Sequence, residues 1–87
     1  MNFLHKDLGH LSGGEVIEVT LTSAANVKMM DGSNFNSYRN GDRHKYFGGH
    51  VTRSPFRLAV PGPGHWHVAV DLGGYGGSVR AGIRILG

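Results

Sequence analysis

Alternation of apolar and polar residues is the main pattern along the chain. In residues 15–22, Ile17, Val19 and Leu21 share one face of an extended strand, and the intervening side chains are polar. Because successive residues of a strand point to opposite faces, this stretch predicts a half-buried strand. The same alternation recurs in four later stretches: 25–29, 56–60, 65–72 and 78–85. In the last two, Trp66, Val68, Val70 and Leu72, and then Val79, Ala81, Ile83 and Ile85, are predicted to face the core.

Two further stretches alternate less clearly. Residues 3–8 and 43–47 have the length of short strands, and they carry Lys6, Arg43 and Lys45. Charged side chains on an unpaired strand discourage association with other chains. We therefore expect both stretches to lie at the edges of sheets.

One short helical turn is predicted between Ser33 and Asn40. Ser33 has the side chain of a typical N-cap, and Gly41 is suited to the left-handed conformation that often ends a helix. Phe35 and Tyr38 are three residues apart, so they lie on one side of such a turn. That side is expected to pack inward.

Glycine pairs separate the predicted strands, as expected for tight turns. They fall at 13–14, 48–49, 73–74 and 76–77. Seven to eight short strands and one helical turn indicate an all-β protein: an antiparallel β-sandwich, jelly-roll-like, formed as a single domain over residues 1–87. A small closed barrel is the alternative.

Composition narrows the class of protein. The 87 residues include fifteen glycines and no cysteine, so neither disulfides nor a thiolate zinc site supports the core. Uninterrupted apolar runs, such as 58–60, do not exceed three residues, which excludes membrane spans and a secretory signal core. We expect a soluble, cytoplasmic protein without a membrane partner.

The net charge of +3 is concentrated in the middle of the chain. Residues 32–57 contain five arginines and lysines against one acid, interleaved with aromatic rings. Cations attract phosphates and aromatic faces stack on bases, so this segment suggests nucleotide or nucleic-acid binding, although no RNP fingerprint is present. The candidate ligand- or anion-binding residues are Tyr38, Arg39, Arg43, Lys45 and Tyr46, together with Tyr75 in a glycine-rich loop. The simpler interpretation is that the rings pack, the cations keep edge strands soluble and the loop joins two strands.

The most specific chemical feature is the pair His65 and His67. On a strand the two imidazoles share one face, with Cα atoms about 6.6 to 7 Å apart, so they are able to chelate one divalent metal ion. Asp71 on the same face is the nearest candidate for a third ligand; His5, His10, His44 or His50 from a neighbouring strand are alternatives. Cupin-like metalloproteins also place His-x-His on a jelly-roll strand, but they add a glutamate that this chain lacks. The alternative is that both histidines lie on a solvated face and bond to backbone or water.

Signs of catalysis are few. The sequence has no GxSxG elbow and no cysteine nucleophile, and its acids are scattered. This argues against an enzyme. It favours a binding or interaction module that requires no cofactor, unless the histidines hold a metal.

Several segments together resemble a known family. They are the opening 2–5, the turn 31–35 followed by Tyr38 and Arg39, the stretches 46–49 and 54–55, and the run GHWHVAVDLGGYGG at 64–77. The chain is similar to a bacterial domain-of-unknown-function family of small all-β proteins, some of whose members are fused to TIR domains. The resemblance implies an accessory or sensing module that binds something and reports it. From the residues themselves, our first hypothesis is a sandwich that binds a protein partner, a second copy of itself or a small ligand through its loops and the basic central segment.

Overall fold

The computed structural model describes residues 3–73 and 77–87, and among them it contains seven strands and one helix. Their order and bounds are β1 (Phe3–Leu11), β2 (Val16–Leu21), β3 (Ala25–Asp31), α1 (Gly32–Arg39), β4 (Phe47–Val51), β5 (Phe56–Ala59), β6 (Gly64–Asp71) and β7 (Ala81–Ile85).

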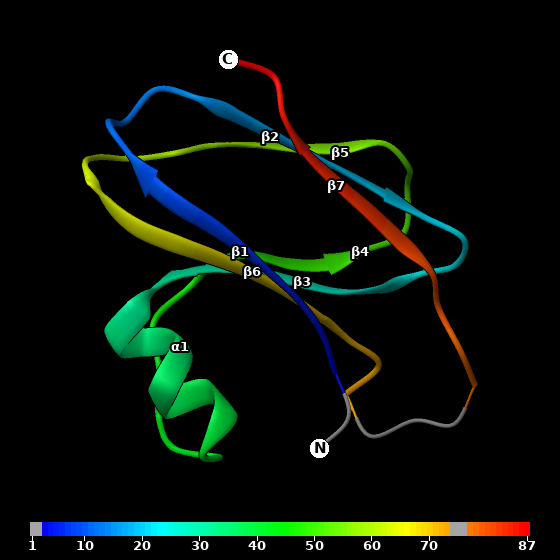
Figure 1. The fold of residues 1–87 in the computed structure, drawn as a ribbon. Helices are drawn as coiled ribbons and strands as arrows, with labels where there is room; N and C mark the ends of the chain where they lie inside the picture. Colours follow the sequence, from blue (N-terminus) through cyan, green and yellow to red (C-terminus); the bar gives the residue numbers. More distant parts are fainter. Residues whose placement is uncertain (1–2, 74–76) are drawn as a thin grey trace.

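The strands form two antiparallel sheets. Sheet A has four strands in the order β1-β6-β3-β4, and sheet B has three in the order β5-β2-β7. Figure 1 shows the sheets as two layers, with α1 beside sheet A on the side away from sheet B. The predicted antiparallel sandwich is therefore confirmed, and the strands described do not close into a barrel. The jelly-roll connectivity remains a prediction.

The space between the sheets is filled by the alternating apolar residues. Ile17 and Val19 of β2 and Val27 and Met29 of β3 are fully buried, as is Val68 of β6. The even-numbered residues of β6 face this core as predicted: Trp66, Val68 and Val70 are buried, and Leu72 is partly buried against them. Val79, which precedes β7, and Ala81 and Ile83 within it pack against the core as predicted. Ile85 is 44% exposed, so its predicted core position was wrong. Ile85 is partly uncovered because it is the last residue of β7, an edge strand of the small sheet B.

Helix α1 covers the outer face of sheet A. It begins one residue earlier than predicted, because the carboxylate of Asp31, and not the Ser33 hydroxyl, accepts the backbone N–H of Asn34 at 2.9 Å and acts as N-cap. Gly41 follows the helix with φ of +80°, as its left-handed role predicts. Phe35 and Tyr38 are buried in a second apolar cluster whose other buried members are Met30 and Ala69.

A buried polar contact attaches the helix to the sheet. The Tyr38 hydroxyl donates to Oδ2 of Asp71 on β6 at 2.6 Å, and the Asn26 amide donates to Oδ1 at 2.9 Å. The backbone N–H of Gly73 also donates to Oδ1. Burial alone would raise the pKa of Asp71, but these hydrogen bonds outweigh it and hold that pKa below its usual range. Burial and the Asp71 carboxylate together raise the pKa of Tyr38, so the phenol stays protonated as a donor.

Strand β4 lies later in the chain than predicted. Residues 43–47 were expected to form a strand, but the pairing with β3 begins only at Phe47 and includes Gly48 and Gly49. Gly48 has φ of +124°, and a Cβ added to it would collide with the carbonyl oxygen of Val27. The close approach of the two backbones thus requires glycine, which an alternation of side chains does not reveal.

The outer face of sheet B carries one glutamate that forms salt bridges with two arginines. Glu18 of β2 lies opposite both Arg57 of β5 and Arg84 of β7. Arg84 Nε donates to Glu18 at 2.7 Å and Arg57 Nη2 at 2.9 Å, and these bonds lower the pKa of Glu18. The carboxylate, which is buried beneath the two guanidinium groups, is therefore stabilised as an anion.

Within the described residues, no helix has the length and apolar character needed to cross a lipid bilayer.

The first prediction concerns Gly48. Gly48→Ala combines a left-handed backbone with a steric collision, so the free energy of unfolding should fall by at least about 2 kcal/mol in urea denaturation. Gly62→Ala is the matched control: its φ lies outside the left-handed region, and an added Cβ meets no described atom within 4 Å. Equal stability of the two variants would contradict the close approach of β3 and β4.

The second prediction concerns the attachment of α1. Tyr38→Phe removes one charge-assisted hydrogen bond from the buried Asp71 carboxylate and should lower the free energy of unfolding by about 1.5 to 3 kcal/mol. Tyr46→Phe is the control, since Tyr46 is 43% exposed, and its change should stay within about 0.5 kcal/mol. Denaturant titrations of both variants measure the difference. A Tyr38→Phe protein as stable as the control would show that the hydroxyl does not anchor the helix.

Candidate functional site

An irregularity in β1 determines which side chains share the outer face of sheet A. The β1–β6 register pairs His5 with Ala69 and Asp7 with His67, and then shifts between Asp7 and Gly9. After the shift His10 lies opposite His65. Leu8 is buried in the core, as its even number in β1 predicts. The extra residue reverses the alternation beyond this point, so the even-numbered His10 lies on the outer face.

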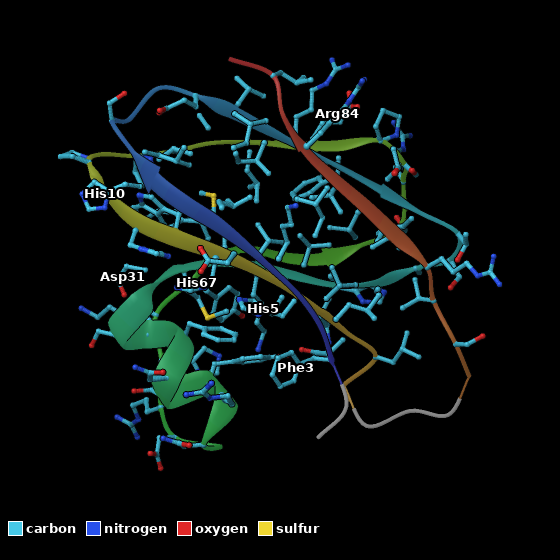
Figure 2. The ribbon with its side chains drawn as sticks, in the orientation of Figure 1. Phe3, His5, His10, Asp31, His67 and Arg84 are labelled. Carbon is cyan, nitrogen blue, oxygen red and sulfur yellow. The ribbon has the colours of Figure 1, made fainter. Side chains whose placement is uncertain are left out.

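Four histidines and one aspartate therefore lie on this face: His5, Asp7, His10, His65 and His67. Directly paired residues of antiparallel strands project from the same side of a sheet, which explains the convergence. Figure 2 shows His5 and His67 close together in the space between α1 and strands β1 and β6, with His10 farther along β1.

Hydrogen bonds link these side chains in two pairs. His65 Nε2 lies 2.6 Å from Asp7 Oδ1, and the same oxygen accepts the backbone N–H of Gly9 at 2.8 Å. His5 Nε2 lies 2.9 Å from His67 Nδ1, so one of these two nitrogens is the donor and the other the acceptor. Both pairs cross from β1 to β6.

The ring of Phe35 covers two of the imidazoles. It stacks on His5 with centroids 4.1 Å apart and on His67 at 4.7 Å, with interplanar angles of 15° and 11°. The His65 ring in turn stacks on His67, with ring centroids 4.9 Å apart. Because Phe35 is buried in the contact between α1 and sheet A, the helix restricts the orientation of the histidine rings.

The cluster opens into a groove of about 450 Å³ between α1 and the outer face of the sheet. It is lined by His5, Asp7, Gly32, Phe35, Asn36, Arg39, His65 and His67. Asp7 and His65 are exposed and His67 is partly buried, so solutes reach the cluster from the open side.

Local electrostatics favour unprotonated ligands. The Gly9 N–H and the His65 hydrogen bond lower the pKa of Asp7, so it is a carboxylate at neutral pH. Burial lowers the pKa of His67, and the opposing effect of the Asp7 charge is smaller. Burial also lowers the pKa of His5, and the positive charge of Arg39 adds to that effect.

Three of the side chains are close enough to share a metal ion. Asp7, His65 and His67 each offer one ligand atom, and these atoms lie within 4.8 Å of one another. In the part of the chain that the structure describes, this is the one group of three or more such residues.

Two of these three candidate ligands, His65 and His67, were also candidates in the sequence, which named Asp71 as the nearest third. His65 and His67 do share a face, whereas Asp71 lies farther along β6 under α1, with its carboxylate bonded to Tyr38 and Asn26. Asp7 takes the position expected of Asp71. The alternation of Phe3, His5 and Asp7 places Asp7 on one face of β1. That this face adjoins the histidines of β6 becomes known only from the pairing of the two strands.

The residues proposed for anion or nucleic-acid binding are dispersed. Tyr38 is buried, and Tyr46 packs its ring 4.6 Å from Lys28 Nζ. Arg43 and Lys45 are exposed in the connection between α1 and β4, and Arg39 alone lines the groove. Tyr75 lies outside the described residues.

The third prediction follows from the lowered pKa values of His5 and His67. As the pH falls below about 6.5, the unfolded chain binds protons at these positions before the folded protein does, so stability decreases. Denaturant titrations between about pH 7.5 and pH 5.5, with a chelator present, should show this loss. It should shrink in the double variant His5→Gln/His67→Gln and persist in His50→Gln. NMR titration midpoints at or above 6.5 for both imidazoles would contradict the prediction.

Comparison with known proteins confirms that the chain belongs to a family of unknown function, whereas bacterial origin and fusion to TIR domains remain predictions. No curated protein and no solved structure matches the chain significantly. A family match does extend over residues 1–87, the whole chain, and its description is "Domain of unknown function (DUF1883)". The sandwich and its histidine-lined groove are thus features of a chain that belongs to the DUF1883 family.

Proposed function

We propose that this domain is a binding module whose ligand is a divalent transition-metal ion, held by Asp7, His65 and His67. The observation that carries the proposal is the convergence of three ligand atoms, from two paired strands, within 4.8 Å of one another. Two strands joined by backbone hydrogen bonds keep these ligands in place before any ion arrives.

The donor set limits the class of ion. Imidazole nitrogen suits zinc, iron, nickel and copper, and one carboxylate oxygen beside two imidazoles is common in zinc and non-haem iron sites. An all-oxygen environment preferred by calcium or magnesium is not offered by these three groups. We therefore expect a first-row transition metal, with zinc as the simplest probe.

Neighbouring groups support the three ligands. His5 hydrogen-bonds the Nδ1 of His67, and the Gly9 N–H holds Asp7 Oδ1. Such contacts fix the orientation of a ligand and tune its basicity. The lowered pKa values of Asp7 and His67 also mean that fewer protons must be displaced when the ion binds near neutral pH.

Metal binding must replace existing contacts. The bond between His65 and Asp7 joins two side chains that are about half exposed, with 48% and 52% of their side-chain surface accessible. A contact between two exposed polar side chains contributes at most about 1 kcal/mol, so its loss costs little compared with the metal–ligand bonds formed. The exposed pair is therefore suited to open around a cation.

The fourth prediction tests the site directly. Untagged protein titrated with Zn²⁺ in a calorimeter should bind one ion per chain, and His67→Ala should weaken binding by at least about tenfold. Asp7→Asn, which keeps the shape of the side chain but not its charge, should do the same. His50→Ala is the control, because His50 lies on β4 beside Asn26 and away from the cluster.

Circular dichroism of each variant confirms that it is folded. Absence of stoichiometric Zn²⁺ in the wild-type protein, or equal affinity in His67→Ala and His50→Ala, would refute the proposed site.

A further inference from the structure

Arg39 places a guanidinium group in the same groove as the metal ligands. It occupies the last position of α1, and its Nη2 donates to Asn36 Oδ1 at 3.0 Å. Its Cζ lies 5.6 Å from the centroid of the Phe35 ring, the same ring that stacks on His5 and His67. Phe35 thus joins the arginine to the histidine cluster.

No carboxylate of the described residues lies within 4.0 Å of the Arg39 guanidinium group. Among the described residues, the arginines with acidic partners within 4.0 Å are Arg57 and Arg84, which share Glu18 on the opposite sheet. Arg39 is exposed and uses one of its five N–H donors on the neutral Asn36 amide. The remaining donors are available to an anion in the groove.

Three protein ligands leave coordination positions open on a transition metal. With a divalent ion bound, the groove contains +2 from the metal and +1 from Arg39 against −1 from Asp7, a net charge of +2. Without the ion, Arg39 and Asp7 cancel. The groove therefore has the net positive charge that attracts an anion only when the metal is present.

We propose that the metal-loaded groove binds a small oxyanion, a carboxylate or a phosphate. One of its oxygens ligates the metal, and the guanidinium fork of Arg39 contacts that oxygen and a second one. This inference rests on the proposed metal site. A planar guanidinium fork matches the spacing of two oxygens in such groups. The groove volume of about 450 Å³ leaves room for the rest of a small metabolite attached to the oxyanion.

The dependence on metal is the distinguishing feature of this site. A basic surface that binds anions through long-range attraction alone would do so with or without a metal, and exchanging Arg39 for lysine would change little. A two-point site needs both the ion and the fork. Arg39→Lys keeps the charge and loses the bidentate geometry, so it separates the two explanations.

The experiment uses the Co²⁺-loaded full chain, because the visible absorption of Co²⁺ reports changes in its ligands. Inorganic phosphate and acetate are titrated separately, and each is expected to shift the spectrum with saturation. Arg39→Ala should weaken this response roughly 10- to 100-fold, and Arg39→Lys should weaken it less. Arg43→Ala is the control, since Arg43 is an exposed cation outside the groove lining.

The outcomes separate this inference from the proposed function. If Co²⁺ does not bind, both fail. If Co²⁺ binds but neither anion changes its spectrum, or if Arg39→Ala and Arg43→Ala respond alike, the metal site stands and the oxyanion inference is overturned. Equal anion affinity of the metal-free protein, measured by calorimetry, also overturns it. A response to phosphate alone or to acetate alone supports the inference and identifies the group that is recognised.

Discussion

The contact between α1 and sheet A is the constraint on which the groove depends. A sandwich needs apolar side chains only between its sheets, and its outer faces are normally solvated. Here the outer face of sheet A carries Ala69 and Asp71, both buried, because the helix covers them. The Tyr38–Asp71 hydrogen bond fixes the helix there, and Phe35 then forms one wall of the groove. Without that contact the histidines would lie on an open sheet surface.

The sequence predicted features that depend on one segment, and it did not predict those that depend on contacts between segments. Five stretches with clear alternation became strands, since burial on one face is visible in a single segment. The strand at 43–47 was misplaced because β4 depends on backbone proximity at Gly48. The cap at Asp31 was missed because an aspartate and a serine two residues later are both good caps, and only the packing of Phe35 and Tyr38 selects the start of the helix.

The candidate site was half predictable for a related reason. His65 and His67 lie in one strand, so their common face follows from a period of two. Asp7 comes from another strand, and its partnership with His67 requires the pairing of β1 with β6. Nearness along the sequence favoured Asp71, but tertiary structure assigns that carboxylate to a buried hydrogen-bond network. Pairing between distant strands is the information that a single sequence lacks.

Burial distinguishes the roles of the two aspartates, which have similar hydrogen-bonding partners. Each accepts a backbone N–H from the residue two positions later, Gly9 or Gly73, and each bonds a side chain from another element. Asp71 is 3% exposed, so breaking its bonds would leave a charge without water, and its place is structural. Asp7 is in contact with solvent, so breaking its bond to His65 costs the fold little, as the proposed metal site requires. The same carboxylate group thus fixes the helix at one end of the β1–β6 pair and, toward the other end, is the acidic member of the proposed metal site.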